Sequence, residues 1–166
     1  MNLFIVRHAI AAEAGSAGFT DDCQRPLTEK GRVKMEAIAR GLHSLDVNLD
    51  MILSSPYLRA RETADILADV FKMKARPALN ENLTPIGDIQ RLIGDITAST
   101  SVENLALVGH EPSLSALVST LLAGTPDILV NMKKGGVCCL TLDNFRKDRA
   151  MLEWLLTPSQ LMKLGE

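Results

Sequence analysis

Short apolar runs alternate with longer amphipathic stretches along this chain. The apolar runs predict β-strands at residues 2–6, 50–55, 75–79, 104–110, 136–142 and 151–156. The longer stretches repeat apolar residues with a helical period and predict helices at residues 27–45, 56–71, 86–97 and 112–124. An alternation of strands and helices is typical of a mostly parallel sheet with helices on both faces. We therefore expect an α/β protein with α/β/α layers, in which the last two strands form a hairpin.

Capping residues mark the ends of several predicted helices. Thr28 is placed to cap the first helix, and Gly124 is placed to close the fourth. Ser55 and Pro56 predict the N-cap and the first residue of the second helix, and Pro112 predicts the start of the fourth. The apolar faces of the first and third helices are predicted to contain Met35, Ile38, Ala39, Leu42 and Leu45, and Ile86, Ile89, Ile93 and Ile96.

The composition fits one globular domain spanning residues 1–166. Hydrophobic residues make up 46% of the chain, and no repeat or long linker divides it. The net charge of −2 comes from interspersed acids and bases, so we expect no binding to nucleic acid or to a membrane surface. The apolar runs are too short to span a bilayer, and no leader-like pattern precedes the first strand. We therefore expect a cytoplasmic protein.

The three cysteines of the chain do not suggest a disulfide framework or a metal site. Cys23 lies alone in a polar stretch, whereas Cys138 and Cys139 are adjacent within a predicted strand. The number is odd, and no CxxC spacing is present. We expect Cys138 and Cys139 to fill the core.

Basic side chains follow three of the predicted strands. Arg7 and His8 end the first strand, Arg59 lies in the first turn after the second, and His110 ends the fourth. Because ligands of parallel sheets bind outside the carboxyl ends of the strands, we expect these residues to meet at one edge. Helix N-termini at that edge favour anions, and guanidinium groups bind phosphate oxygens in a fork. The arrangement predicts a site for a phosphoryl group.

Each of these residues also has a simpler interpretation when taken alone. A histidine at a strand end or an arginine on a helix is often only a solvated surface group. The coincidence carries the prediction, because two of the three histidines in the chain end strands. The third, His43, lies near the end of a helix, where we expect it on the surface. No Walker loop, dinucleotide fingerprint or HExxH motif offers a competing site.

Four motifs of the chain resemble those of the histidine phosphatase superfamily, which has the phosphoglycerate-mutase-like fold. They are "VRHA", "LTEKGR", "SSPYLRARET" and "LVGHEP". Ala9 stands where the superfamily has Gly after the Arg-His pair. The chain length and the stretches "RPLT", "LTPIGD" and "WLLTPSQL" are most similar to the SixA-type phosphohistidine phosphatases.

This resemblance implies a mechanism that needs no metal and no cofactor. It implies that neutral His8 attacks phosphorus, that a phosphohistidine forms on His8, and that water then hydrolyses it. Arg7, Arg59 and His110 would bind the non-bridging oxygens and supply the charge that phosphoryl transfer requires. We expect Arg7 and Arg59 to lower the pKa of His8 and thereby keep its ring neutral.

The leaving group decides the substrate class. A phosphate ester needs a general acid, whereas phosphohistidine expels a better leaving group. In ester-cleaving members of the superfamily a Glu on a later loop is that acid. Glu81 is the candidate here, with a solvated loop carboxylate as the alternative, and Asn82 stands where SixA-type sequences have Glu. Glu111 either orients a ring or caps a helix.

The resemblance favours a histidine-phosphorylated protein as the substrate, for example a histidine phosphotransfer domain. The chain lacks the long helical insertions that cover the pocket in larger relatives, which would leave the site open to a side chain of another protein. Two alternatives are kept: a small-molecule phosphomonoesterase with the same nucleophile, and a non-catalytic module that binds phosphohistidine. The complete set of Arg7, His8, Arg59 and His110 argues against the second alternative.

Overall fold

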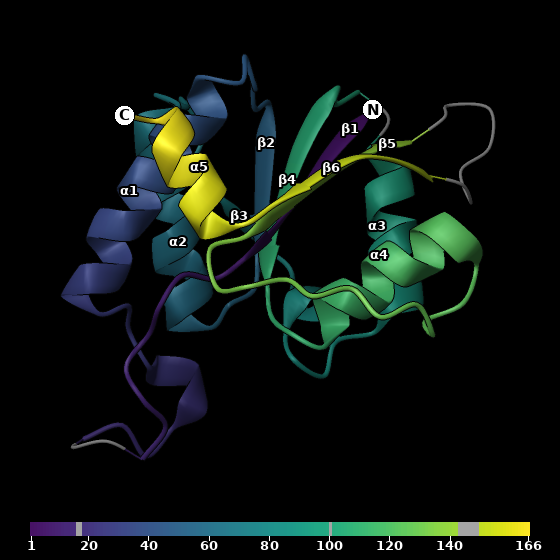
Figure 1. Ribbon diagram of the computed structural model, residues 1–166. Coiled ribbons are helices and arrows are strands. Elements are labelled where there is room, and N and C mark those ends of the chain that lie inside the picture. Colours follow the sequence, from purple (N-terminus) through teal and green to yellow (C-terminus); the bar gives the residue numbers. More distant parts are fainter. Residues whose placement is uncertain (16–17, 100, 143–149) are drawn as a thin grey trace.

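The computed structural model describes residues 1–15, 18–99, 101–142 and 150–166. Its strands are β1 (Asn2–Arg7), β2 (Met51–Ser54), β3 (Ala78–Leu79), β4 (Asn104–Gly109), β5 (Val137–Leu142) and β6 (Ala150–Leu156) (Figure 1). Its helices are α1 (Glu29–His43), α2 (Leu58–Val70), α3 (Ile89–Ala98), α4 (Ser113–Ala123) and α5 (Pro158–Leu164), with short 3-10 turns η1 (Asp22–Gln24) and η2 (Glu81–Leu83). Within the described ranges, no helix is long and apolar enough to cross a membrane.

The strands form a single sheet with the order β3-β2-β4-β1-β5-β6. β1 to β4 are mutually parallel, and β1 pairs with β4 over its full length, so that Arg7 lies opposite Gly109. β5 is antiparallel to β1, and β6 is antiparallel to β5. The predicted mostly parallel sheet and C-terminal hairpin are confirmed, and the hairpin connection at residues 143–149 lies outside the described residues.

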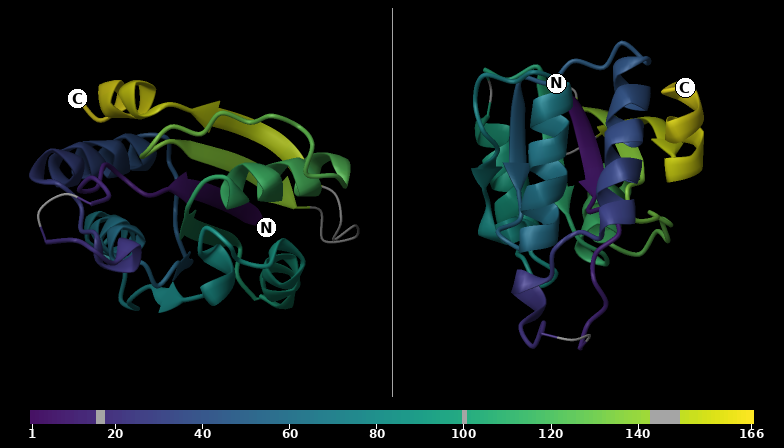
Figure 2. Two further views of the ribbon diagram at one scale, coloured as in Figure 1. Left: turned by 90° about the horizontal axis from the view of Figure 1, so that it is seen from below. Right: turned by 90° about the vertical axis from the view of Figure 1, so that its left-hand side faces the viewer.

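The sheet separates two apolar clusters. Phe4 and Val6 of β1 pack with residues of α1, α2 and α5, whereas Leu3 and Ile5 pack with residues of α3 and α4. Each of these four side chains is at most 5% exposed. Successive residues of a strand point to opposite faces, and both faces are covered. Figure 2 shows the helices on both sides of the sheet, which confirms the α/β/α prediction.

Three of the predicted helix ends are confirmed. The Thr28 hydroxyl caps α1 by accepting a hydrogen bond from the N–H of Gly31. Gly124 closes α4 with a φ of 75°, a conformation that suits glycine. Pro112 is the N-cap of α4, which begins at the next residue.

The predicted start of α2 is wrong. The helix begins at Leu58, and its N-cap Tyr57 makes no side-chain capping bond. The Ser55 hydroxyl accepts a hydrogen bond from the N–H of Tyr57 and contacts His110. Ser55 and Pro56 therefore form the turn before the helix, because the hydroxyl that was expected to cap it has another partner.

Two predicted core positions are also wrong. Ile86 is 91% exposed. The Asp88 carboxylate accepts hydrogen bonds from backbone N–H groups of the next turn, so α3 starts only at Ile89. Leu45 follows the end of α1 and is 37% exposed. The other residues of the two predicted faces are buried or half-buried.

α5 is a helix that the apolar pattern does not predict. Thr157 and Gln160 bond each other's backbone in a capping box, and Pro158 occupies the first turn. Leu161 is fully buried in the cluster that contains α1. For α5, the capping residues in the sequence indicate a helix more clearly than the spacing of its apolar residues does.

Two of the cysteines belong to the core, as predicted. Cys138 and Cys139 are buried neighbours on β5, and their side chains fall into different apolar clusters. Burial raises the pKa of Cys138 to about 12 and that of Cys139 to about 11. Such thiols are poor nucleophiles, which fits a packing role. Cys23 is also a free thiol.

Candidate active site

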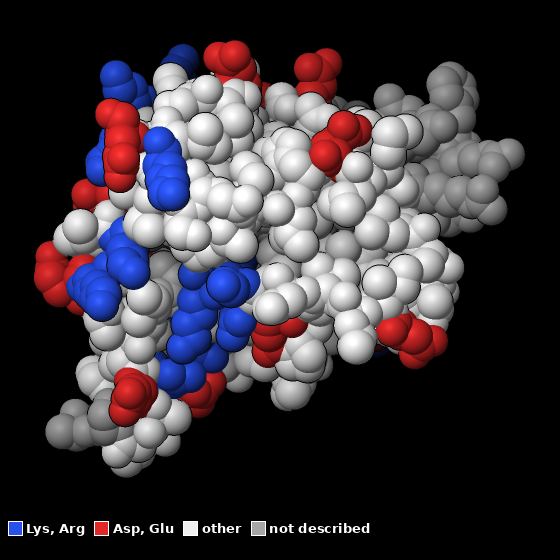
Figure 3. Space-filling model, viewed as in Figure 1, with Lys and Arg blue, Asp and Glu red and all other residues white. Residues whose placement is uncertain are grey.

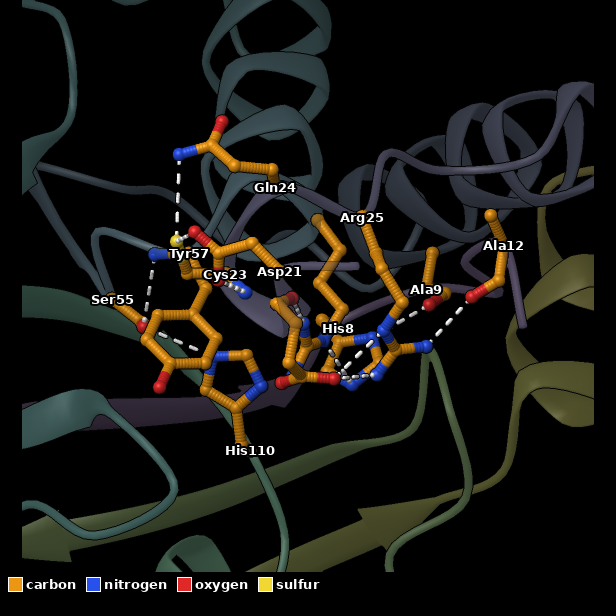
Figure 4. A network of polar contacts seen from close by, with 12 residues as sticks. His8, Ala9, Ala12, Asp21, Cys23, Gln24, Arg25, Ser55, Tyr57 and His110 are labelled. Atoms are coloured by element: carbon orange, nitrogen blue, oxygen red, sulfur yellow. Dashed lines mark hydrogen bonds and ion pairs between the residues drawn. The ribbon is translucent and has the colours of Figure 1, made fainter. Parts of the chain in front are cut away.

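The ends of β1 and β4 place two imidazole rings side by side. The N–H of His8 donates to the carbonyl of Gly109 at 3.0 Å, which extends the pairing of the two strands. His110 is the next residue after Gly109, and the two ring centroids lie 5.0 Å apart. His8 is 6% exposed and His110 1% exposed. Figure 4 shows the rings next to each other, with Tyr57 on the side of His110 and Arg25 on the side of His8.

The His8 ring has a defined tautomer. Its Nδ1 lies 2.7 Å from the carbonyl oxygen of Ala9, which only accepts hydrogen bonds, so Nδ1 carries the proton. Nε2 therefore has a lone pair, and Arg59 Nε donates to it at 3.3 Å. Burial is the main cause that lowers the pKa of His8 to about 3, with added contributions from the charges of Arg59 and Arg7, against an opposing effect of the Ala9 bond. At neutral pH the ring is uncharged, and the lone pair on Nε2 is unprotonated.

The His110 ring is held by Ser55. His110 Nε2 lies 2.9 Å from the Ser55 hydroxyl, which already accepts the N–H of Tyr57. The hydroxyl proton finds an acceptor if Ser55 donates to Nε2, and this places the ring proton of His110 on Nδ1. That Nδ1 is buried and has no hydrogen-bond partner among the described residues. Burial, followed by the effects of His8 and Arg59, lowers the pKa of His110 to about 2.

Arg59 reaches the rings from the first turn of α2. Its side chain is 4% exposed and forms an ion pair with Asp22, in which Nη2 lies 2.9 Å from Oδ2. Nη1 donates to the backbone carbonyl of Asp22 at 2.6 Å, and the guanidinium lies over the Tyr57 ring at 5.0 Å. The Asp22 carboxylate also accepts from Arg25 Nε at 2.8 Å. The loop after β1 thus fixes the position of Arg59.

Arg7 contributes a second guanidinium beside His8. Its Nη1 donates to the carbonyl of Met132 at 2.7 Å. Its Nε is buried and has no hydrogen-bond partner among the described residues. In the described part of the chain only three buried side-chain nitrogen or oxygen atoms lack a partner, and Arg7 Nε and His110 Nδ1 are two of them. Buried donors without a partner are rare, and a bound anion is one way to satisfy them.

A hydrogen-bond chain connects the end of β1 to α2. The N–H of Ala9 donates to Thr63 Oγ1 at 3.0 Å, and that hydroxyl donates to the carbonyl of Arg59 at 2.7 Å. Ala9 is 2% exposed and does not have a positive φ, so the chain conformation accommodates alanine where the superfamily has glycine. The segment that carries His8 and the helix that carries Arg59 are therefore held in one arrangement.

Neither candidate carboxylate makes a hydrogen bond or ion pair with the described residues of this network. Glu81 is exposed on η2, and its carboxylate makes no hydrogen bond or ion pair with another described residue. Glu111 accepts a hydrogen bond from the Ser115 hydroxyl in the first turn of α4, so its contact is with that helix and not with a ring. His43 is exposed at the end of α1, as predicted. Within the described ranges, no group of three or more His, Cys, Asp or Glu is arranged to hold a metal ion.

Four residues of this network are not among the sequence candidates: Asp22, Arg25, Ser55 and Tyr57. Asp22 and Arg25 lie in a loop without apolar period, so no pattern relates them to Arg59. The sequence offers a signal for Ser55 and Tyr57, because both lie between the end of the second strand and the helix that carries Arg59. The turn before α2 directs the Ser55 hydroxyl toward His110. The path of this turn depends on the tertiary structure, so the sequence alone does not predict the contact.

Comparison with known proteins identifies the family. The model of the histidine phosphatase superfamily (branch 1) matches residues 3–85. An uncharacterized protein of Picosynechococcus sp. is 34% identical over 139 residues, which is 82% of each chain. Phosphohistidine phosphatase SixA of Escherichia coli is 28% identical over 164 residues, covering 97% of this chain and 96% of SixA. The chain belongs to the histidine phosphatase superfamily.

A solved structure extends this similarity to the fold. The protein histidine phosphatase SixA complexed with tungstate matches with a TM-score of 0.83 and 27% identity, over 97% of this chain and 99% of that one. The resemblance inferred from the sequence motifs is confirmed for the superfamily and for the SixA relatives. Membership in this superfamily, together with SixA as a full-length relative, supports phosphatase activity and hence a hydrolase.

Proposed function

We propose that this protein hydrolyses phosphohistidine on another protein, with His8 as the nucleophile. The observation that carries the proposal is that Arg59 donates to His8 Nε2 while two further donors of the neighbouring residues Arg7 and His110 are buried and unpaired among the described residues. Arg7 Nε and His110 Nδ1 are buried and have no partner in the described part of the chain, and Arg59 Nε lies 3.3 Å from His8 Nε2. Donors fixed in a buried site suit the non-bridging oxygens of a phosphoryl group. SixA, the full-length relative, was solved with tungstate, which like phosphate is a tetrahedral oxyanion.

The proposed reaction has two steps. The lone pair of His8 Nε2 attacks phosphorus, the substrate P–N bond breaks, and the substrate imidazole, protonated on its other nitrogen, leaves as a neutral ring. The proton on Nδ1 of His8 stays hydrogen-bonded to the Ala9 carbonyl, which stabilises the positive charge on the phosphorylated ring. Water then attacks the phosphohistidine and releases inorganic phosphate, which restores neutral His8. Arg7, Arg59 and His110 hold the non-bridging oxygens throughout.

The environment of Glu81 supports phosphohistidine over an ester as the substrate. An ester oxygen leaves with the help of a general acid, which contributes about 10²–10⁴-fold. Glu81 is exposed and has no described contact that would fix it over the site. A small-molecule phosphomonoesterase with the same nucleophile is the second candidate. The neutral ring of His8, with its free electron pair, disfavours a module that only binds phosphohistidine.

We further propose that residues 1–166 act as one domain in the cytoplasm. The proposed partner is a histidine-phosphorylated protein such as a histidine phosphotransfer domain. Because the arginines supply the positive charge at the site, we propose that neither a metal ion nor another cofactor takes part.

A side-by-side assay tests the substrate class. The purified protein is given a histidine phosphotransfer domain phosphorylated with phosphoramidate, and in parallel p-nitrophenyl phosphate, phosphoserine and glycerol phosphate, all with EDTA present. We expect kcat/KM on the phosphorylated domain to exceed that on every ester by at least about 10²-fold, since only the esters need a general acid. Higher kcat/KM on an alkyl ester would favour the phosphomonoesterase, and activity that requires an added divalent ion would contradict the metal-free mechanism.

A further inference from the structure

A groove with a basic lining lies directly beside the candidate active site. It has a volume of about 340 Å³ and lies between α1, the start of α5 and the loop before β5. Arg7, Lys34, Lys133 and Lys134 line it, and no Asp or Glu is among its described lining residues. Figure 3 shows Lys and Arg side chains gathered over this part of the surface, with acidic atoms at the borders of the blue patch and not within it.

The lysines of this groove form no ion pair with any residue of the described ranges. Lys34, Lys133 and Lys134 take part in none of the salt bridges between described residues, in contrast to Arg25 and Arg59, which share Asp22. Lys133 and Lys134 are exposed, and Lys34 is half-buried. Three adjacent cations on a loop and a helix repel one another, and an anionic partner relieves that repulsion.

Arg7 joins the groove to the phosphate donors. Its side chain lines the groove, and its Nη1 bonds the carbonyl of Met132, the residue before Lys133. Lys134 also contributes to the lowered pKa of His8, so the charge of the groove extends to the nucleophile. When the phosphoryl group of a protein substrate lies at His8, the residues of the substrate next to its phosphohistidine are therefore within reach of the lysines.

The groove is not uniformly polar. Ile10, Ile38 and Pro158 line it together with the lysines. Apolar walls exclude water and lower the local dielectric constant, which strengthens the attraction between opposite charges. A mixture of apolar wall and separated charges suits the side chains of a polypeptide, with carboxylates at the ends of aliphatic stems.

We propose that this groove binds acidic side chains that flank the phosphorylated histidine of the protein substrate. The inference rests on the function proposed above and adds a preference: among histidine-phosphorylated proteins, the preferred ones have Asp or Glu next to the reactive histidine. Complementary charges act chiefly on the rate of encounter and on the choice of partner. The effect is therefore expected in KM and in its salt dependence, with kcat nearly unchanged.

Two synthetic peptides of equal length test this preference. Both contain one histidine phosphorylated with phosphoramidate, which is flanked on each side by Glu in one peptide and by Gln in the other; phosphoramidate alone is the probe without flanks. We expect wild-type kcat/KM to be about tenfold higher on the Glu peptide at low salt, and the ratio to fall below about threefold in ~0.5 M NaCl, because salt screens exposed charges.

Charge reversal at the groove should remove the preference. The double variant Lys34→Glu with Lys133→Glu is expected to hydrolyse the Glu peptide no faster than the Gln peptide. Its activity on phosphoramidate should stay within about twofold of wild type, since neither Lys34 nor Lys133 is among the charges that act on the pKa of His8. If the reversed charges impair folding, the milder double variant Lys34→Gln with Lys133→Gln is used in the same assay. Lys72→Glu with Lys74→Glu, two exposed lysines after α2, is the matched control and should keep the preference.

The outcomes separate this inference from the function on which it rests. Equal wild-type kcat/KM on the two peptides, or a preference that survives both groove variants, overturns the proposal for the groove alone. If wild type has equal kcat/KM on the two peptides but prefers a small phosphoester with a second anionic group, the groove binds a small molecule. This result also overturns the proposal for the groove. If wild type hydrolyses neither peptide nor phosphoramidate, the proposed function fails first.

Discussion

Two regions at the same edge of the sheet differ sharply in how they hold their polar side chains. At the ends of β1 and β4, His8, His110 and the nearby Arg59 are at most 6% exposed, and each contacts another polar group of the site. In η2, which follows β3, Glu81 is exposed and its carboxylate has no described partner. The fold therefore fixes the proposed nucleophile and the donors proposed for anionic oxygens, whereas no described residue fixes the Glu81 carboxylate, the candidate proton donor.

This difference bears on the chemistry that each region is able to support. A donor that is buried and already oriented interacts strongly with developing charge, because little water screens it and no reorganisation is needed. A solvated carboxylate on a surface turn lacks both advantages. A substrate whose leaving group needs little proton assistance suits this asymmetry, and phosphohistidine is such a substrate. The predictions below test whether activity depends on the first region and not on the second.

The largest effect is expected from removing His8, the proposed nucleophile. His8→Ala should abolish turnover of a phosphohistidine protein, since no other described imidazole in the site combines a free lone pair with Arg59 as a neighbour. The fold should be retained, as judged by circular dichroism and thermal unfolding. His43→Ala, which removes the exposed histidine at the end of α1, is the control and should keep wild-type activity. Near wild-type turnover by His8→Ala would refute its role.

Loss of Arg59 should have the next largest effect. Arg59→Ala is expected to lower kcat by about 10²–10³-fold, the size typical of losing one donor to developing charge. Arg61→Ala, on an exposed position of the same helix, should change kcat by less than about twofold. Steady-state kinetics on one phosphohistidine substrate compares both variants. A loss below tenfold for Arg59→Ala would mean that the buried guanidinium only supports the structure.

A smaller effect is expected from Ser55, which orients His110 from the turn before α2. Ser55→Ala should lower kcat about tenfold, because it removes one hydrogen bond worth ~1–1.5 kcal/mol and frees the ring to change its tautomer. Ser54→Ala is the matched control, since that buried hydroxyl bonds a backbone carbonyl and no ring. Equal kcat values for the two variants would argue against a defined His110 tautomer.

The smallest effect is expected in the second region. Glu81→Gln should change kcat/KM on a phosphohistidine protein by less than about threefold, since the exposed carboxylate is far less fixed than a general acid that contributes ~10²–10⁴-fold. The same variant is measured on p-nitrophenyl phosphate and on an alkyl phosphate. A hundredfold drop on phosphohistidine would contradict the contrast between the two regions. Strong wild-type activity on the alkyl ester that the variant loses would favour the phosphomonoesterase.

Much of the fold follows from local patterns in the sequence. The alternation of apolar runs and amphipathic stretches predicts the layers, because a short continuous apolar run marks a strand buried on both faces and a period of about 3.6 residues marks a helix that buries one face. Where the apolar period is weak, capping residues determine where a helix begins. Asp88 caps α3, so that Ile86 lies before the helix and is exposed. The capping box of Thr157 and Gln160 marks the start of α5. Side chains that compete with the helix backbone for hydrogen bonds are hard to assign from the period alone.

The meeting of His8, Arg59 and His110 follows from topology. Parallel strands deliver their carboxyl ends to one edge, and this rule is sufficient to place the three residues together. The partners that orient them are not predictable in the same way. Asp22 reaches Arg59 from a loop, and Ser55 turns toward His110 instead of capping α2. Such contacts depend on three-dimensional bends that no sequence period encodes.

The central claim, that His8 accepts the phosphoryl group, is tested most directly by trapping the phosphoenzyme. The protein is mixed with phosphoramidate carrying radioactive phosphate, quenched in alkaline detergent and digested, and the labelled peptide is identified by mass spectrometry. We predict a label that is stable to base and labile to acid, on the peptide that contains His8, and no label in His8→Ala. A label on His110 or on any other residue, or turnover that persists in His8→Ala, would contradict the account.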